Sequence, residues 1–212
     1  MKMVHAFILT KKKSHFLSCH YLALSLCLII SVMILLVGAS ASGKTEIAKY
    51  LRRQYGIVKA ITHTSRSPRV GEKDGIDYFF VSKDKFLSLI KDGCFVEHTL
   101  YNGNYYGCSK SQIADDKCVI VDPNGLKNFL VLHNHRLISF YLEAPETVRE
   151  ERMIGRGDKA ELIIQRLALD RIAFADGNIE KTDFLIETGN KPIEKIGDDI
   201  YLKYVQELKK RR

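Results

Sequence analysis

Cysteine pairs of the Cys-x-x-Cys kind are lacking in this sequence, and the number of cysteines is odd. Such pairs are typical of zinc sites, and even numbers of cysteines are typical of disulfide frameworks. The sequence therefore predicts neither feature. We interpret the cysteines as reduced thiols of a cytosolic protein: Cys19, Cys27, Cys94, Cys108 and Cys118. Internal repeats, low-complexity stretches and long linkers are lacking as well, and 212 residues suffice for one or two domains.

Acidic residues are lacking in residues 1–32, which carry four lysines. The whole chain has a net charge of +8, so an excess of +4 belongs to residues 33–212. An excess of this size suits a protein that binds polyanionic nucleotides. Without a basic stripe it is too small to predict a groove for DNA or RNA, and we expect no nucleic-acid partner.

Charged residues are also lacking between Lys13 and Lys44, and Phe16–Val37 is nearly all apolar. Basic residues before such a run resemble a signal peptide or a membrane anchor. The end of the run, Met33–Val37, is however needed as a strand before a glycine-rich loop. Residues 1–32 are therefore an anchor, a targeting segment, or translated sequence upstream of a true start at Met33. We favour the third interpretation, which predicts that a chain beginning at Met33 folds and keeps full activity.

The glycine-rich loop matches the pattern Gly-x-x-x-x-Gly-Lys-[Ser/Thr] and reads Gly38-Ala39-Ser40-Ala41-Ser42-Gly43-Lys44-Thr45. A buried strand before it and a helix over Thr45–Tyr55 after it are the context that a phosphate-binding loop needs. Glycines let backbone N–H groups turn toward phosphate oxygens, and the helix start adds unpaired donors. Lys44 would bind the β- and γ-phosphates, and the hydroxyl of Thr45 would coordinate Mg²⁺. The sequence predicts a nucleoside triphosphate site.

Strands and helices alternate after Met33, which predicts a parallel sheet with crossover helices. The strands are short and rich in Val, Ile and Leu, as strands covered on both faces should be. We expect them at Val32–Val37, Ile57–Ile61, Cys118–Asp122, Leu137–Leu142 and Phe184–Glu187. We expect helices at Thr45–Tyr55, Pro123–Leu132, Pro145–Ile154, Glu161–Ala175 and Pro192–Lys210, three of which start at a proline.

Residues 62–114 break this alternation because they are richer in polar, aromatic and glycine residues. They include a short helix at Lys83–Lys91 and a strand at Phe95–Leu100. Asn102-Gly103 then precedes Tyr105-Tyr106, and an Asn-Gly pair between strands is a strong hairpin signal. The segment predicts a small α+β lobe inserted into the nucleotide-binding core.

The inserted lobe carries a candidate anion clamp. Arg66 and Arg69 are three residues apart beside several hydroxyls, and guanidinium groups bind phosphate oxygens two at a time. The spacing alone is equally compatible with a solvated basic loop. Farther on, Glu97 could accept two hydrogen bonds from the N1–H and N2–H₂ edge of guanine, although a lone glutamate there is more typical of an exposed strand.

Six segments occur in the order and spacing of one enzyme family. They are the phosphate-binding loop, Thr62-x-x-x-Arg66-x-Pro68-Arg69-x-Gly71-Glu72, Gly75-x-Asp77-Tyr78-x-Phe80-Val81, Phe95-x-Glu97, Gly103-Asn104-Tyr105-Tyr106-Gly107, and Gly155-Arg156-Gly157 with Gln165-Arg166-Leu167. From about Met33 to Arg212 the chain resembles the guanylate kinases, which transfer the γ-phosphate of ATP to GMP.

The resemblance implies a fold and a division of the chain. The fold would be α/β, a P-loop three-layer core with a parallel sheet, an inserted small α+β acceptor-binding lobe and a short lid. The guanylate kinase domain would span residues 33–212 after the extension 1–32. Its core would comprise 33–61, 115–150 and 167–212, its GMP-binding lobe 62–114, and its lid 151–166.

The resemblance also implies site residues and partners. The loop Gly38–Thr45 would bind ATP, with Mg²⁺ as the metal at Thr45. The catalytic cations would be Lys44, Arg152, Arg156 and Arg166. GMP would be bound by Thr62, Arg66, Arg69, Tyr78, Glu97, Tyr106, Cys108 and Asp122. We expect ATP and GMP (and dGMP) as substrates, a cytoplasmic monomer or homodimer, and no membrane association unless residues 1–32 are a genuine anchor.

The chain departs from the family at a few positions. Cys108 stands where a serine that contributes to guanine recognition is usual, and a thiol is a weaker hydrogen-bonding group. Ile120 replaces an acid that would help to organise Mg²⁺. The segment Glu187-Thr188-Gly189-Asn190 replaces an Asn-Asp turn on the adenine side, and the lid is one residue shorter.

Two alternative functions remain open. A non-catalytic guanylate-kinase-like interaction module would keep the acceptor lobe but usually lacks the loop lysine, which is present here as Lys44. A related kinase would use another small acceptor, such as a different nucleotide or a phosphorylated sugar. Glu97 favours guanine, and Cys108 weakens that preference.

Overall fold

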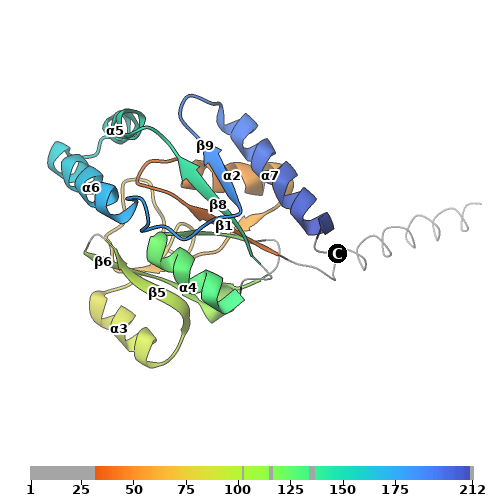
Figure 1. The fold of residues 1–212 in the computed structure, drawn as a ribbon. Helices are drawn as coiled ribbons and strands as arrows, with labels where there is room; N and C mark the ends of the chain where they lie inside the picture. Colours follow the sequence, from red (N-terminus) through yellow and green to blue (C-terminus); the bar gives the residue numbers. More distant parts are fainter. Residues whose placement is uncertain (1–31, 102, 115–116, 134–136, 211–212) are drawn as a thin grey trace, which may run out of the picture. The chain divides into compact units, whose positions relative to one another are not determined.

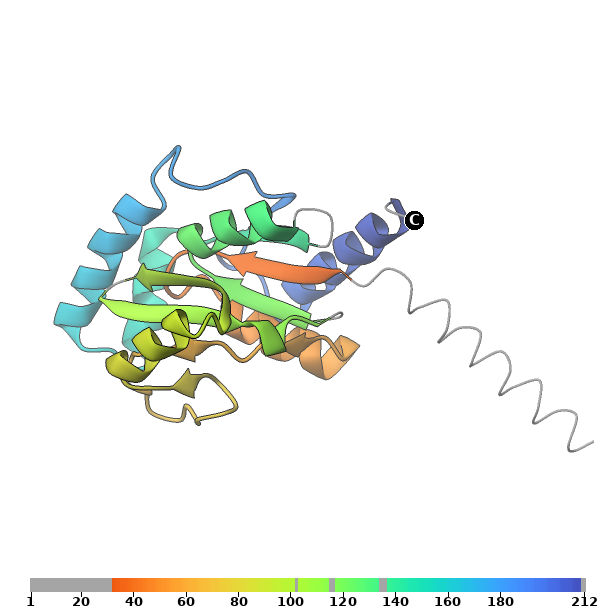
Figure 2. The same ribbon diagram turned by 90° about the horizontal axis from the view of Figure 1, so that it is seen from below.

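The structure is a computed structural model that describes residues 32–101, 103–114, 117–133 and 137–210. Residues 1–31 lie outside the described residues, so the three interpretations of the N-terminal extension stay predictions. Asn102, the first residue of the predicted Asn-Gly turn, also lies outside them. Figures 1 and 2 show the described part in two views.

The larger sheet has five parallel strands in the order β2-β7-β1-β8-β9. This confirms the predicted α/β class with a parallel sheet. The strands are β1 (Met33–Val37), β2 (Val58–Lys59), β7 (Lys117–Val121), β8 (Leu137–Glu143) and β9 (Phe184–Glu187). All five residues of β1 are buried, because this apolar strand lies at the centre of the sheet.

Helices cover both faces of this sheet (Figures 1 and 2). On one face, alternate residues of β1 (Met33, Leu35 and Val37) join a core cluster with Leu126 and Phe129 of α4 (Pro123–His133). On the other face lie α2 (Lys44–Tyr55) and α7 (Ile193–Lys210), which pack against each other. The helices α5 (Glu146–Gly155) and α6 (Ala160–Ala173) form a pair beside the sheet.

The smaller sheet has four strands in the order β4-β3-β6-β5. Its strands are β3 (His63–Thr64), β4 (Phe79–Phe80), β5 (Phe95–Tyr101) and β6 (Asn104–Ser109), and it is accompanied by α3 (Lys83–Lys91) and the short 3₁₀ helix η1 (Lys110–Gln112). The pairs β5–β6 and β3–β6 are antiparallel, whereas β3–β4 is parallel. The predicted α+β insertion is therefore a second sheet with its own helix.

An aromatic cluster holds the smaller sheet to α3. Phe86 of α3 is fully buried and stacks on Phe95 and on Tyr105, with ring centroids 4.6 and 5.4 Å away. A Cβ atom on Gly107 would lie only 2.9 Å from Cζ of Phe86, so this strand position requires glycine. Ser82 caps the start of α3 by accepting a hydrogen bond from the backbone N of Lys85.

The predicted boundaries differ from the observed ones mainly at β2. The sequence predicts a strand over Ile57–Ile61, but the structure has strand only at Val58–Lys59. Beyond it, the N–H of Ala60 still donates to the carbonyl of Cys118, at 2.7 Å, whereas the N–H of Ile61 donates to Oε1 of Gln112, at 3.1 Å. The ladder ends there because a side chain replaces the neighbouring strand as acceptor.

The predicted lid, residues 151–166, consists of the last turn of α5, a short connection and the first half of α6. Gly157 lies in that connection with φ 80°, a left-handed conformation that favours glycine. Among the helices of the described residues, none combines the length and the apolar composition required to cross a membrane.

Candidate functional site

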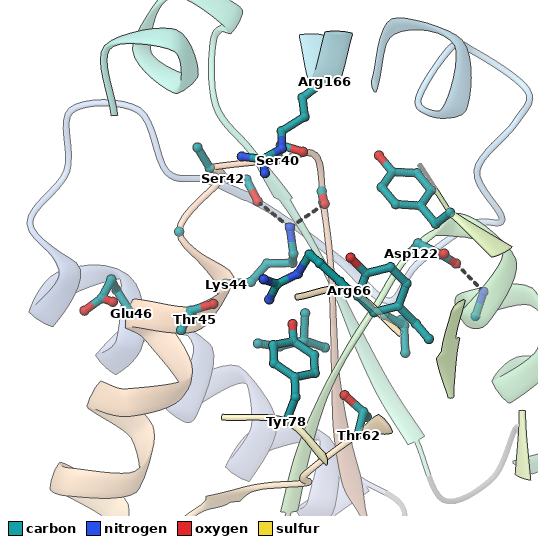
Figure 3. Close-up of a pocket in the computed structure, with 18 of the residues that line it drawn as sticks. Ser40, Ser42, Lys44, Thr45, Glu46, Thr62, Arg66, Tyr78, Asp122 and Arg166 are labelled. Atoms are coloured by element: carbon teal, nitrogen blue, oxygen red, sulfur yellow. Dashed lines mark hydrogen bonds between the residues drawn. The ribbon is translucent and has the colours of Figure 1, made fainter. Parts of the chain in front are cut away.

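A cavity of about 560 Å³ opens at the carboxyl ends of β1 and β7, where the smaller sheet faces the larger one (Figure 3). This is the edge at which ligands bind in open parallel sheets. Seventeen of the nineteen predicted site residues line the cavity, and the other two are Ala39 and Cys108. Among residues that sequence reasoning did not select, the cavity is also lined by Glu46, Thr99, Tyr101, Asn104, Ile120, Phe174, Lys191 and Ile193.

The glycine-rich loop after β1 has the backbone that its sequence predicts. A Cβ atom on Gly38 would lie 2.4 Å from the carbonyl oxygen of Leu142, so only glycine fits between β1 and β8. Gly43 has φ 99° and leads directly into α2. The loop therefore places the unpaired N–H groups of the helix start at the cavity.

Lys44 lies at the centre of the site, between Arg166 on one side and Arg66 and Tyr78 on the other (Figure 3). Its ammonium donates to the carbonyl oxygens of Gly38 at 2.6 Å and Ala39 at 2.8 Å, and to Oγ of Ser42 at 3.4 Å. Burial lowers the pKa of Lys44 to about 8.

Both arginines of the predicted clamp line the cavity and are organised by Glu72. Nη2 of Arg66 donates to both carboxylate oxygens of Glu72, at 3.0 Å each. The backbone N–H of Arg69 donates to the same carboxylate at 2.7 Å. Glu72 therefore orders the loop that carries both guanidinium groups. Such order favours an anion clamp over a basic loop that is merely solvated.

Two tyrosines stand behind the clamp. The guanidinium of Arg66 lies 5.3 Å from the ring centroid of Tyr78, and the rings of Tyr78 and Tyr106 are 6.3 Å apart. The ammonium of Lys59 also lies over the Tyr78 ring at 4.7 Å and donates to the carbonyl of Asp77. These contacts hold the two tyrosine rings in the cavity wall.

Three further arginines reach the cavity from α5 and α6. Arg156 and Arg166 share the carboxylate of Asp158, with N–O distances of 2.5 Å. Arg152 instead donates to the carbonyl oxygens of Ala41 at 3.1 Å and Gly189 at 2.7 Å. Arg152 therefore joins the glycine-rich loop to the connection that precedes α7.

The cationic groups influence one another across the cavity. Burial and the neighbouring Arg66, Arg156 and Arg166 lower the pKa of Arg69. The residues Arg69 and Arg156 also contribute to the lowered pKa of Lys44. Side chains from the glycine-rich loop, the inserted lobe and the α5–α6 pair thus create one positive potential in the cavity.

Two carboxyl groups, Glu97 and Asp122, line another part of the cavity, apart from the cationic groups. Glu97 on β5 is 7% exposed, and burial followed by the nearby Asp122 raises its pKa to about 8. Asp122 follows β7 and caps α4 by accepting a hydrogen bond from the N–H of Gly125, at 2.7 Å. Oε2 of Glu97 and Oδ2 of Asp122 are buried without a hydrogen-bond partner within the described residues. Two such oxygens in a cavity wall can form hydrogen bonds with a ligand.

Cys108 differs from its predicted place. Its thiol does not line the cavity but joins the core cluster that includes Val119 and Leu126, and its Sγ lies 3.9 Å from the carbonyl of Ser109. Tyr106, two residues earlier on the same face of β6, lines the cavity, whereas Cys108 lies farther along the strand, inside this core cluster. Its backbone N–H, however, donates to Oε1 of Glu97 at 3.2 Å.

Thr62 and Thr45 stand at opposite parts of the cavity (Figure 3). Thr62 is buried, and Thr45 is exposed in the first turn of α2. No cluster of three His, Cys, Asp or Glu side chains within the described ranges could hold a metal ion. The exposed hydroxyl next to Lys44 suits a magnesium ion that arrives with phosphates and keeps its waters, because Mg²⁺ needs few protein ligands in such sites.

Sequence reasoning missed Glu72, Asp158 and Asp170 as functional residues. Each is an acid that holds an arginine of the site or of its surroundings: Glu72 holds Arg66, Asp158 holds Arg166, and Asp170 holds Arg149. Glu72 lies in the arginine motif, and its spacing of three from Arg69 is a usable signal. Asp170 carries no such signal, because its partners lie far away in the sequence.

The arrangement can bind two phosphorylated molecules at once. The glycine-rich loop and Lys44 offer a site for a polyphosphate, and Arg66 with Arg69 offers a site for a second phosphate. The carboxyl pair offers acceptors to a base that donates two hydrogen bonds. Charge cancellation and alignment are the requirements of phosphoryl transfer.

Comparisons with known proteins point to the same chemistry. The sequence model of the family described as guanylate kinase matches residues 31–200. A guanylate kinase of Anaplasma phagocytophilum is 32% identical over 181 residues, which cover 81% of this chain and 84% of that protein. One from Schizosaccharomyces pombe is 33% identical over 182 residues, covering 82% and 86%. The crystal structure of guanylate kinase from Anaplasma phagocytophilum superposes with a TM-score of 0.63 at 25% identity, covering 84% of this chain and 87% of that chain.

Proposed function

The chain belongs to the guanylate kinase family and is an enzyme that phosphorylates GMP with ATP, and we propose that the cavity is where this transfer takes place. The products are ADP and GDP. We propose dGMP as a second acceptor, because the residues assigned to GMP would contact its base and its phosphate, and dGMP has both. The predicted division into core, GMP-binding lobe and lid is part of this proposal.

The donor half of the site is proposed to consist of Gly38–Thr45. Backbone N–H groups of the loop would surround the phosphates of ATP, and Lys44 would exchange its carbonyl partners for phosphate oxygens. Thr45 would hold Mg²⁺, which supplies charge cancellation between the phosphates when it is bound. Ile120 lines the cavity where a carboxylate would otherwise be available.

The acceptor half is proposed to lie in the smaller sheet. Arg66 and Arg69, with the hydroxyls of Tyr78 and Tyr106, would hold the phosphate of GMP. Glu97 would read the N1–H and N2–H₂ edge of guanine, and Asp122 and Thr62 would contact the base side. Cys108 would take part through its backbone N–H, which orients Glu97, rather than through its thiol.

The transfer itself is proposed to depend on Lys44, Arg156 and Arg166 around the moving phosphoryl group. Arg152 would act by fixing the carbonyls of Ala41 and Gly189. Closing of the acceptor half and of the α5–α6 pair over the cavity would exclude water, which would otherwise accept the phosphoryl group. We also propose a cytoplasmic monomer or homodimer.

One observation supports the proposal above all others. Lys44 and the two arginines of the clamp, Arg66 and Arg69, line one cavity. Separate sites for the two phosphates would give binding but no direct transfer. This arrangement therefore favours a kinase over a non-catalytic interaction module, which would need only the acceptor half.

The test is a coupled assay of ADP release with GMP, dGMP, AMP, IMP, CMP and UMP as acceptors. We expect GMP to give the highest kcat/KM, and Lys44→Ala to lower kcat by about a hundredfold or more because a preorganised cation is lost. Arg66→Ala should chiefly raise the KM for GMP.

The exposed Arg53 on α2 is a matched control, because it lies outside the cavity lining and Arg53→Ala should leave both constants unchanged. Preference for another acceptor would show a related kinase, and no response to any acceptor would favour the interaction module.

A further inference from the structure

Asp170 on α6 is a buried carboxylate that the transfer chemistry does not use. Its side chain is 1% exposed. Oδ2 accepts from the backbone N of Ser40 at 2.8 Å and from Nη1 of Arg149 at 2.8 Å. Oδ1 accepts from Oγ of Ser40 at 3.3 Å and from the hydroxyl of Tyr101. We call these four residues the Asp170 node.

A carboxylate is costly to bury unless every lone pair is used and a cation neutralises it. Arg149, itself only 8% exposed, supplies the cation, and its Nη1 also lies 3.4 Å from the carbonyl of Ser40. Behind Arg149, Glu146 lies 3.8 Å from its Nη2 and forms a second ion pair with Arg171. Both carboxylate oxygens of Asp170 are therefore hydrogen-bonded and its charge is neutralised, although Nε of Arg149 is buried without a hydrogen-bond partner within the described residues.

The node joins the two halves of the site. Ser40 belongs to the glycine-rich loop on the donor side, and Tyr101 is the last residue of β5 on the acceptor side. Both line the cavity. The end of the β5–β6 hairpin lies beside α6 in both ribbon views (Figures 1 and 2). Of the groups that meet at Asp170, the Tyr101 hydroxyl is the one from the smaller sheet.

The same helix face also carries Arg166. Residues four apart in an α-helix share one face, so Asp170 lies one turn beyond Arg166 on α6. Any movement of α6 that shifts Arg166 within the cavity therefore also moves the carboxylate to which Ser40 and Tyr101 are bound.

We propose that Tyr101 and Asp170 are positioning residues for phosphoryl transfer. Their hydrogen bond holds β5, and with it the acceptor, in register with the glycine-rich loop that holds the donor. The proposal rests on the function proposed above, because it assigns the donor to the loop and the acceptor to the smaller sheet. In-line transfer tolerates little misplacement of the two reacting atoms, so a lost tie between the halves lowers the rate more than it weakens binding of either substrate.

The experiment compares Tyr101→Phe with Tyr55→Phe. Tyr55 also donates its hydroxyl to a carboxylate, Oδ1 of Asp198 at 2.6 Å, but joins α2 to α7 away from the cavity. We expect Tyr101→Phe to lower kcat by about tenfold or more, with KM for ATP and GMP within about threefold of wild type. Tyr55→Phe should leave kcat unchanged. Equal losses of Tm with unchanged kcat in both variants would show a merely structural role and overturn the proposal.

A second comparison tests the route through Asp170. Replacing the ion pair as a unit, in Arg149→Leu/Asp170→Ala, avoids leaving one buried charge alone. In that background Tyr101→Phe should have no further effect on kcat, because its partner is already gone. An equal fall of kcat in both backgrounds would mean that the hydroxyl acts on the substrates directly, and the proposal would be wrong. Activity of the wild-type enzyme on GMP is measured first, so failure of the proposed function is seen separately.

Discussion

At the scale of single residues, Glu97 and Asp122 show a conflict between recognition and stability. Each has a carboxyl oxygen buried without a partner within the described residues, burial raises the pKa of both groups, and Asp122 raises the pKa of Glu97 further. The free protein therefore favours a protonated Glu97 at neutral pH, whereas a base with two donors needs the ionised form. We therefore predict that guanine binding is linked to proton release from Glu97.

Glu97→Gln tests this linkage through stability. The pKa of Glu97 is about 8 in the folded protein against an ordinary value of 4.5, so the folded state binds the proton more tightly. Its contribution is fully present below pH 4.5 and is lost as the pH rises through 8. We expect Glu97→Gln to gain on the order of a few kcal/mol relative to wild type between pH 5 and pH 9, measured by urea unfolding.

The same variant should be more stable but less active. The amide cannot accept both donors of guanine, so KM for GMP should rise by about ten- to a hundredfold. In the wild type, KM for GMP should fall as the pH rises toward 8. A difference in unfolding free energy between the two proteins that does not change with pH would contradict the assignment of the raised pKa to Glu97.

The cationic residues that line the cavity were predictable from sequence, and most of the acids that hold cations in place were not. Arg66, Arg69 and Lys44 stand in short motifs whose spacing carries the chemistry. Asp170 binds groups that lie 21, 69 and 130 positions away, so no local pattern reveals it. Cys108 shows the converse case, because its place in a motif says nothing about whether its thiol or its N–H faces the site.

At the scale of helices and strands, apolar runs predicted β1, β7, β8 and β9 to within about a residue at each end. The strands β3 and β4 have two residues each and escaped prediction as separate strands, because two residues show no periodicity. Their existence depends on pairing: β3 is a strand because it lies between β6 and β4.

Gly197 shows how tightly two helices can pack. A Cβ atom at this position of α7 would lie 2.2 Å from Cδ1 of Tyr50 on α2. Tyr50 cannot turn aside freely, because its hydroxyl donates to Oδ1 of Asp198 at 2.7 Å. The glycine is therefore required by the α2–α7 contact and not by its own backbone.

We expect Gly197→Ala to destabilise the protein by about 1–3 kcal/mol, measured by thermal or urea unfolding, although alanine favours helices. Gly155→Ala in α5 is the matched control, because nothing lies within 4 Å of the added Cβ. It should be neutral or stabilising by up to about 1 kcal/mol. Equal effects of the two substitutions would show that the contact with Tyr50 is not decisive.

At the scale of the whole molecule, both sheets and the cavity are built from residues 32–210. The hydroxyl of Tyr204 near the end of α7 donates to the carbonyl of Val32, at 2.9 Å, and so closes the described chain on itself. The match to the family begins at residue 31. Within the described residues, Val32 is thus the first that is tied to the rest of the fold.

We predict that a chain lacking residues 1–31 folds and keeps the kcat and KM of the full chain. A chain that begins at Met33 should do the same with a slightly lower Tm, because Tyr204 loses its acceptor, at a cost of about 1 kcal/mol. Thermal unfolding and the coupled assay on both chains measure this. Insolubility or lost activity of the longer of the two would mean that residues 1–31 contribute to the enzyme.

The cavity brings together like charges from three parts of the chain: Lys44 from one loop, Arg66 and Arg69 from the smaller sheet, and Arg156 and Arg166 from the α5–α6 pair. Besides burial, which has the largest effect, their mutual repulsion lowers the pKa of Arg69. It also opposes any tightening of these parts around an empty centre. We therefore expect bound nucleotides to act as counter-ions of the cavity as well as substrates, so that these parts come fully together only when nucleotides are bound.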